Sequence, residues 1–290
     1  DVYKRQDCKN FWNYVNSKKC NGDFPECMFL DNVSSNIRNE ITNLFAKHFS
    51  SVYLPENDKP IPTLDYAHNV DICNCIIYNT DVFDELIKLN SHKKPGPDNI
   101  PSSILYNCRF SLCEPIAKLY NISLSTAIFP DCWKSAYIIP IHKSGDKSNI
   151  VNYRPISKLS VLSKTFEKIV HNKISNLFAN VIVPEQHGFT MKKSVATNLV
   201  CYQQYLLSAL ENLEQVDAIY TDFSKAFDKV PHRILVSKMS ALGLGPNLCT
   251  GLDSYLSGRT QTVLLNNQHN SRSINVTSGV PQGAHLSPLL

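Results

Sequence analysis

The sequence lacks long hydrophobic runs, C-x-x-C cysteine pairs and internal repeats, and each absence excludes a class of protein. No apolar stretch among its 290 residues approaches the roughly 20 that a membrane helix needs, and no signal peptide opens the chain. Its ten cysteines contain no C-x-x-C pair, so their spacing supports neither a zinc site nor a disulfide scaffold. We therefore expect an intracellular protein with reduced thiols and no contact with a membrane.

Charged residues make up only 19% of the chain, but they are unevenly distributed. Residues 91–200 hold 14 Lys and Arg against 6 Asp and Glu, whereas residues 1–90 hold 9 against 13. A basic block of this kind fits the phosphates of a nucleic acid, although a solvated lysine-rich surface has the same composition. The candidate nucleic-acid-binding side chains are Lys93, Lys94, Lys192 and Lys193.

Hydrophobic periodicity predicts a series of helices interrupted by a few strands. The expected helices lie near 37–49, after 81, from the capping-box pattern at 111–114 to about 127, over 162–178, and near 195–212, 232–241 and 246–257. The expected strands lie at 135–141, at 215–221 and, as a pair, near 260–266 and 271–276. Helices that alternate with few strands indicate an α/β (α+β) architecture.

Three blocks carry residues suited to phosphate chemistry. In the first, residues 215–221 are expected to form a buried strand that delivers Asp222 at its carboxyl end. A carboxylate held on a rigid strand suits Mg²⁺, a hard cation that prefers oxygen ligands. An aspartate in this position can equally cap the next helix, and for an isolated strand the capping role is the commoner one.

The other two blocks combine fixed turns with polar side chains. The segment 278–283, with its Gly and Pro residues, predicts a sharp turn into a helix that presents the amide of Gln282 to a base, a sugar or a template strand. A basic loop follows the strand at 135–141, and Lys143 and Arg154 flank it in positions suited to gripping a triphosphate. Taken singly, each block also fits an ordinary loop.

Taken together and in this order, the blocks resemble the reverse transcriptase domain of non-LTR (LINE-like) retrotransposons of the Jockey and CR1 kind. The resemblance runs through Lys94-Pro-Gly-Pro-Asp-Asn-Ile-Pro101, Ile139-Pro-Ile-His-Lys143, Asn152-Tyr-Arg154-Pro-Ile-Ser, Ser163-Lys-Thr-Phe-Glu167, Gln186-His-Gly-Phe189, Asp222-Phe-Ser-Lys-Ala-Phe-Asp228, Ser254-Tyr-Leu-Ser-Gly-Arg-Thr-Gln261 and Ser278-Gly-Val-Pro-Gln-Gly283. A group II intron maturase has the same fold, but the amino-acid sequences of residues 94–101 and 222–228 favour the retrotransposon.

The resemblance implies a right-hand polymerase fold. Residues 91–290 would form the fingers and part of the palm, and residues 1–90 would be an extension that joins an endonuclease to the polymerase. The family's paired aspartates and its thumb would lie beyond Leu290. The chain would therefore be a fragment, truncated before the hairpin that carries the paired aspartates.

The resemblance also implies roles for single residues. Asp222, with the backbone carbonyl of Phe223, matches the first metal-binding group of a site for two Mg²⁺ ions. One carboxylate cannot hold two ions, so we expect residues 1–290 alone not to polymerise. Asp228, in the same block, is interpreted as part of the local helix structure rather than as a metal ligand.

Four further residues match groups that handle the incoming nucleotide. Phe227 matches a steric gate, a ring that would clash with a 2′-hydroxyl and so select deoxynucleotides. Lys143 and Arg154 match the fingers residues that clamp the triphosphate. Gln282 matches the amide that lies beside the nucleotide and the template.

The implied activity is RNA-directed DNA synthesis, with an RNA template, a DNA primer or target and dNTPs as partners. The alternative is a truncated or domesticated remnant that binds nucleic acid without catalysis. Copying primed at a DNA target implies work in the nucleus, and the cytoplasm stays open as an alternative. The sequence does not fix the template, the target site or the oligomeric state.

Overall fold

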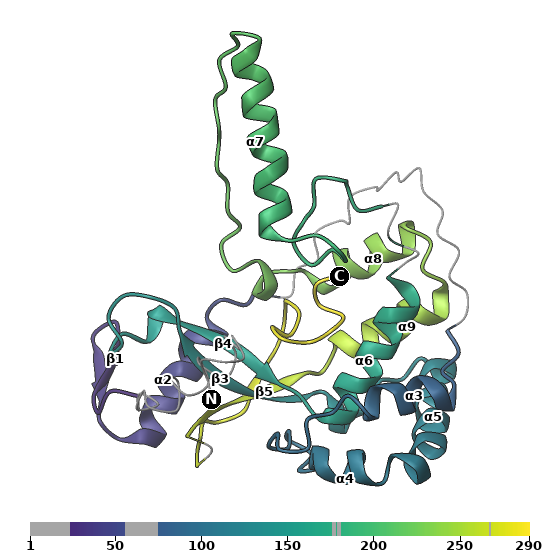
Figure 1. Cartoon of the computed structure of the whole chain (residues 1–290). Coiled ribbons are helices and arrows are strands. Elements are labelled where there is room, and N and C mark those ends of the chain that lie inside the picture. The colour runs from purple at the N-terminus through teal and green to yellow at the C-terminus, as the bar shows by residue number, and fades with distance from the viewer. Residues whose placement is uncertain (1–23, 56–74, 176–177, 179–180, 267) are drawn as a thin grey trace, which may run out of the picture.

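The computed structural model describes residues 24–55, 75–175, 178, 181–266 and 268–290, which form a mixed α and β structure (Figure 1). The α/β (α+β) class predicted from the sequence is therefore confirmed. Residues 1–23 and 56–74 of the predicted extension 1–90 lie outside the described residues. Within the described part, no helix is both long and apolar enough to cross a lipid bilayer.

A small mixed sheet forms the centre of the molecule. Its order is β4 (Tyr153–Lys158), β3 (Ser135–His142), β5 (Thr260–Leu265) and β6 (His269–Asn270), and β7 (Ile274–Asn275) also pairs with β5. β3 runs antiparallel to β4 and parallel to β5. The predicted strand at 135–141 and the predicted pair near 260–276 are thus confirmed.

The N-terminal described segment covers one face of this sheet. It comprises the two-stranded β1 (Met28–Leu30) and β2 (Val33–Ser35) and the helix α2 (Arg38–Ser50), which confirms the helix predicted near 37–49. Ile41 and Phe45 of α2 are fully buried in one core with Ile138 of β3 and Val263 of β5. This segment therefore shares a hydrophobic core with the sheet.

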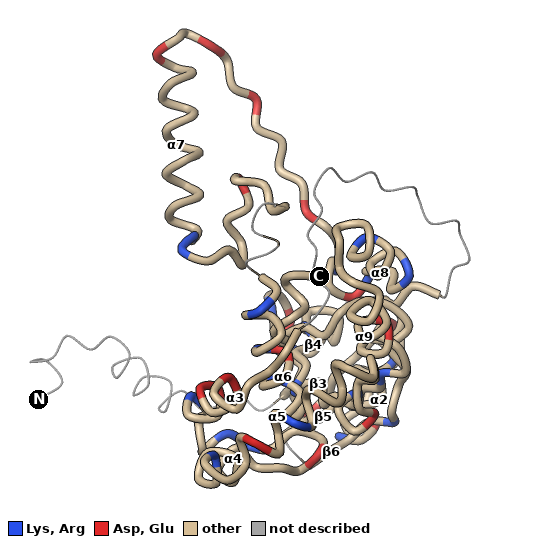
Figure 2. The backbone as a smooth tube through the Cα atoms, turned by 90° about the vertical axis from the view of Figure 1, so that its right-hand side faces the viewer, with Lys and Arg blue, Asp and Glu red and all other residues tan. Residues whose placement is uncertain are grey.

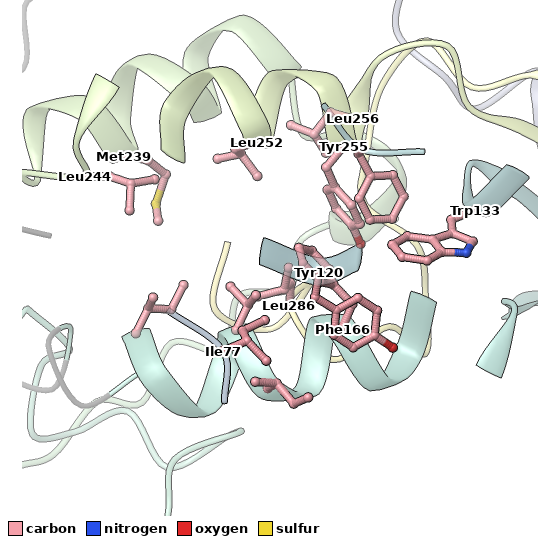
Figure 3. Close-up of a cluster of buried hydrophobic side chains, with 14 of the residues drawn as sticks. Ile77, Tyr120, Trp133, Phe166, Met239, Leu244, Leu252, Tyr255, Leu256 and Leu286 are labelled. Atoms are coloured by element: carbon pink, nitrogen blue, oxygen red, sulfur yellow. The ribbon is translucent and has the colours of Figure 1, made fainter. Parts of the chain in front are cut away.

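A second and larger hydrophobic core lies among the helices. These helices are α3 (Asn79–Leu86), α4 (Ser102–Asn107), α5 (Arg109–Thr126), α6 (Val161–Ile174), α8 (His232–Ala241) and α9 (Pro246–Leu256). Figure 3 shows Tyr120, Trp133, Phe166 and Tyr255 meeting at its centre. The ring of Tyr120 meets those of Trp133 and Phe166 edge to face, and the ring of Tyr255 meets that of Phe129 in the same way, a geometry that favours aromatic pairs beyond the area they bury.

The helix α5 begins earlier than the sequence pattern predicts. Its first residue is Arg109, so residues 111–114 lie inside the helix and form no capping box. Glu114 instead pairs with Lys118 one turn on, with 2.7 Å between the carboxylate oxygen and the ammonium nitrogen. A glutamate at this position can form an ion pair with a lysine four residues on as readily as it can cap a helix. The capping-box pattern at 111–114 is therefore misleading here.

The helix α7 (Val195–Glu211) and the extended residues 212–223 project together from the rest of the molecule, and we call residues 195–223 the α7 arm (Figure 1). The helix is confirmed. Its only charged residue is Glu211, and Figure 2 shows the rest of its length without Lys, Arg, Asp or Glu. All of its residues except Leu206 and Ala209 are exposed.

The buried strand predicted at 215–221 is wrong. These residues form no strand, and Ile219 and Tyr220 are 89% and 87% exposed. None of the described strands pairs with them. A helix satisfies its own backbone hydrogen bonds, whereas a strand needs a neighbour, and this segment has none among the described residues.

Candidate functional site

The turn at 278–282 is held against the short 3₁₀ turn Ala226–Asp228 by several hydrogen bonds. The amide of Val280 donates to the carbonyl of Phe227 at 2.7 Å, and the hydroxyl of Ser278 donates to the carbonyl of Asp228 at 2.7 Å. Gly279 has a φ of +84°, and a methyl group on it would overlap the carbonyl oxygen of Phe227. Only glycine allows the two chain segments to approach this closely.

The predicted turn is therefore confirmed, but the predicted helix after it is not. Residues 284–290 form turns and no helix, and Leu286 and Leu290 pack against the helical core. The backbone carbonyl of Gln282 accepts a hydrogen bond from the amide of Ser157 at 2.8 Å, which attaches the turn to the free edge of β4. The turn is thus fixed on both sides.

A small pocket opens where these segments meet the sheet. It is lined by the turn residues and by the ends of β3, β4 and β5: Tyr53, Ala136, Ile138, Pro155, Ser157, Phe227, Asp228, Arg259, Thr260, Gln261, Val276, Ser278, Gly279, Val280, Pro281 and Gln282. The structure thereby brings together two of the predicted nucleotide-binding residues, Phe227 and Gln282. Tyr53 belongs to this pocket although nothing in its sequence context suggests a site.

Asp228 is the half-buried carboxylate of this pocket. The Nε2 atom of Gln282 donates to both of its oxygens at 3.3 Å. Burial raises the pKa of Asp228, while the hydrogen bond from Gln282 and the charge of Lys225 oppose that rise. Burial raises the pKa of the Tyr53 phenol most, and the negative charge of Asp228 raises it further. Asp228 therefore contacts the predicted site residue directly, which the interpretation as local helix structure missed.

Asp222 and Phe223 lie on the α7 arm. Phe223 is 87% exposed, and the structure records no hydrogen bond or ion pair of Asp222 within the described residues. No group of three His, Cys, Asp or Glu side chains in the described part is arranged to hold a metal ion. The residues described do not, by themselves, fit the predicted pair of Mg²⁺ ions.

Lys143 and Arg154 lie together on the hairpin of β3 and β4. Arg154 is paired with Ile141, and the amide of Lys143 donates to the carbonyl of Asn152 at 2.8 Å. Because side chains alternate along a strand, Arg154 lies on the face of β4 opposite to Ser157, which lines the pocket. Both cations are exposed, and neither takes part in an ion pair among the described residues.

Some lysines of the basic block 91–200 lie close together in the structure. Gly96 packs so tightly on residues 159–160 that a methyl group on it would lie 2.6 Å from the carbonyl oxygen of Leu159. This contact brings the 93–97 turn to the start of α6. Burial lowers the pKa of Lys158 most, and the nearby positive charge of Lys94 lowers it further. Burial lowers the pKa of Lys164 too, with a smaller contribution from Lys93.

The four side chains Lys93, Lys94, Lys158 and Lys164 form no ion pair among the described residues, whereas Lys88, Lys118, Lys134 and Lys173 each have a carboxylate partner. We call the first four the lysine cluster. The remaining predicted basic residues, Lys192 and Lys193, lie in the turn before α7, where the ammonium of Lys193 donates to the carbonyls of Pro184 and Gln186. The basic residues predicted from sequence thus fall into two separate places.

Glu167 is a buried acid whose role the sequence does not reveal. It lies on the apolar side of α6 and is fully buried. Its carboxylate accepts hydrogen bonds from the amide of His285 at 2.9 Å and from the hydroxyl of Ser163 at 3.3 Å. Burial raises the pKa of Glu167, and the charge of Arg259 opposes that rise. Glu167 therefore anchors α6 to the chain just beyond Gln282.

Comparison with known proteins identifies a family model and several relatives. A family model described as reverse transcriptase (RNA-dependent DNA polymerase) matches residues 141–290. The probable RNA-directed DNA polymerase from transposon BS of Drosophila melanogaster is 32% identical over 213 residues, which cover 72% of this chain and 23% of the relative.

Two further relatives come from the same organism. The RNA-directed DNA polymerase from mobile element jockey is 28% identical over 261 residues, covering 87% of this chain and 28% of the relative. The probable RNA-directed DNA polymerase from transposon X-element is 32% identical over 257 residues, covering 85% and 28%. The chain thus spans about a quarter of the length of these relatives.

Proposed function

The chain belongs to the reverse transcriptase (RNA-dependent DNA polymerase) family, and on this premise we propose that it is part of a retrotransposon protein that copies RNA into DNA. The observation that supports this best is the shared pocket of Phe227 and Gln282, since Gln282 bonds to Asp228 across 54 positions of sequence. The partners would be an RNA template, a DNA primer or target, and dNTPs.

The roles of the nucleotide-binding residues follow from this activity. The ring of Phe227 would exclude a 2′-hydroxyl by steric clash, and the amide of Gln282 would contact the nucleotide. Lys143 and Arg154, with no carboxylate partner among the described residues, would clamp the triphosphate, the guanidinium by paired hydrogen bonds. Because Arg154 lies on the face of β4 opposite to the pocket, the hairpin of β3 and β4 would have to reorient to bring both cations to a nucleotide beside Gln282.

The metal site would be completed only in the longer protein. There, Asp222 and the carbonyl of Phe223 would be two oxygen donors for Mg²⁺, beside carboxylates from other segments. Residues 215–221 would then pair with neighbouring strands and carry Asp222 into the palm. Residues 1–290 alone would not polymerise, because they supply one such carboxylate.

The lysine cluster would bind the phosphates of the RNA template. This cluster is also what the alternative function, a non-catalytic remnant that binds nucleic acid, would retain. Copying primed at a DNA target would take place in the nucleus, and epitope-tagged protein found only in the cytoplasm would contradict that location.

Primer extension with the longer protein, an RNA template, a DNA primer, Mg²⁺ and dNTPs tests the proposal. We expect template-dependent DNA synthesis, and we expect Asp222→Asn to reduce it about 10²-fold or more, the scale of a single electrostatic group in a transition state. The matched control is Asp217→Asn on the same arm, which should leave synthesis unchanged. RNA binding without any synthesis would favour the remnant, and synthesis by residues 1–290 alone would refute their predicted inactivity.

A further inference from the structure

The contact between Asp228 and Gln282 has a consequence for hydrogen-bond polarity. An ionised carboxylate can only accept hydrogen bonds, so the atom of the Gln282 amide that faces Asp228 must be the donor Nε2. The structure has this arrangement, with Nε2 at 3.3 Å from both carboxylate oxygens. The other end of the amide, the acceptor Oε1, receives no hydrogen bond from any described residue.

The backbone around this contact leaves the two side chains little freedom. Ser278 and Val280 bond to the carbonyls of Asp228 and Phe227, and the amide of Gly279 donates to the carbonyl of Val230 at 2.8 Å. On its other side, Gln282 is attached to β4 through Ser157. Since both backbone segments are fixed, the carboxylate meets the amide in a defined register.

We propose that Asp228 is a positioning residue that fixes the amide of Gln282 with its acceptor oxygen, Oε1, turned toward a bound nucleotide. The inference rests on the proposed function. It specifies the recognition: an acceptor can bind a hydroxyl or amino group of the sugar or base, but not the phosphate oxygens, which are acceptors themselves. Gln282 therefore selects the nucleoside part, and the triphosphate is left to cations.

The first test uses residues 1–290 and needs no catalysis. In the ¹⁵N-labelled chain, the side-chain NH₂ signals of Gln282, assigned by their loss in Gln282→Glu, should include one proton that is shifted downfield and exchanges slowly with water. Asp228→Ala should move both signals to the values of an exposed glutamine. Asp228→Asn keeps the volume of the side chain and decides the question if the alanine variant does not fold. Its amide offers a donor as well as an acceptor, so the slow exchange of the Gln282 proton should be lost.

The control for this test is Asp217→Ala. Asp217 accepts from the Nε2 of Gln215 at 2.9 Å on the exposed α7 arm, so the variant removes a similar pair elsewhere. It should leave the Gln282 signals unchanged. Gln282 signals that are the same in the wild type and in both Asp228 variants would overturn the proposal.

The second test uses primer extension by the longer protein. Asp228→Ala and Gln282→Ala should each raise the KM for dNTPs about tenfold, the scale of removing one hydrogen bond, with a smaller change in kcat. The double variant should be no worse than Gln282→Ala, because Asp228 acts through that amide. Effects that multiply would overturn the positioning role. A wild-type protein without activity would contradict the proposed function instead, and the amide spectra would still decide the inference.

Discussion

The packed part of the molecule and the α7 arm differ in where their apolar side chains and backbone groups find partners. In the packed part, Phe166 touches the rings of Tyr120, Phe129 and Trp133 and is only 7% exposed. In the arm, Leu210 is 64% exposed. The arm thus presents a large apolar surface of the kind that marks an interface, and its extended residues lack strand neighbours within the described part. The difference separates segments whose apolar side chains and backbone groups find partners within the described residues from an arm that finds few there.

The largest expected effect contrasts one apolar side chain from each part. Phe166→Ala removes a ring from the centre of the helical core and should lower the free energy of unfolding by about 4 kcal/mol. Leu210→Ala on the arm should change it by less than about 0.5 kcal/mol, as an exposed side chain does. Urea denaturation followed by circular dichroism measures both. Similar losses of stability in the two variants would mean that the arm is packed in solution.

The next effect concerns the close approach at Gly279. Gly279→Ala should lower the free energy of unfolding by about 3 kcal/mol, because the methyl group meets the backbone of Phe227 and Asp228. Gly258→Ala is the matched control, since its φ of +67° is also positive but nothing lies within 4 Å. It should cost about 1 kcal/mol from backbone strain alone. Equal destabilisation of the two variants would contradict the close packing of the two turns.

The acid Glu167 tests the packed part through pH. Its pKa is raised on folding, so its contribution to stability is fully present below the pKa of the unfolded chain and is lost as the pH rises through the folded pKa. Glu167→Gln keeps an acceptor for the amide of His285 but does not titrate. From pH 4 to 8, the free energy of unfolding of the wild type should fall relative to the variant, by on the order of 1 kcal/mol. Parallel pH curves would show that Glu167 does not titrate in this range.

The smallest effect compares the basic residues of the two parts. Lys94→Ala with Lys158→Ala should weaken binding of residues 1–290 to single-stranded RNA and reduce the slope of log K against log salt by about 1.4, or about 0.7 for each phosphate that is no longer neutralised. Fluorescence anisotropy at several salt concentrations measures this slope. Lys192→Ala with Lys193→Ala, at the base of the arm, is the comparison pair. An unchanged slope in the first pair would exclude the lysine cluster as a phosphate site.

Periodicity predicted the helices well, because a helix closes its own hydrogen bonds and its apolar stripe is visible in the sequence. The strand predicted at 215–221, around Ala218, Ile219 and Tyr220, was wrong, since strand formation depends on residues elsewhere. The features of the candidate site also differ in whether a local pattern predicts them. The turn at 278–283 was predicted by its Gly and Pro residues, while the interactions of Asp228, Tyr53 and Glu167 depend on tertiary packing that no local pattern encodes.

Residues 215–222 are expected to become a strand only when a further segment pairs with them, and the proposed metal site depends on that pairing. Hydrogen exchange of their backbone amides, measured in residues 1–290 and in the longer protein, tests this most directly. We expect fast exchange in residues 1–290 and strong protection in the longer protein. Protection already present in residues 1–290, or fast exchange in both proteins, would contradict the dependence on a further segment.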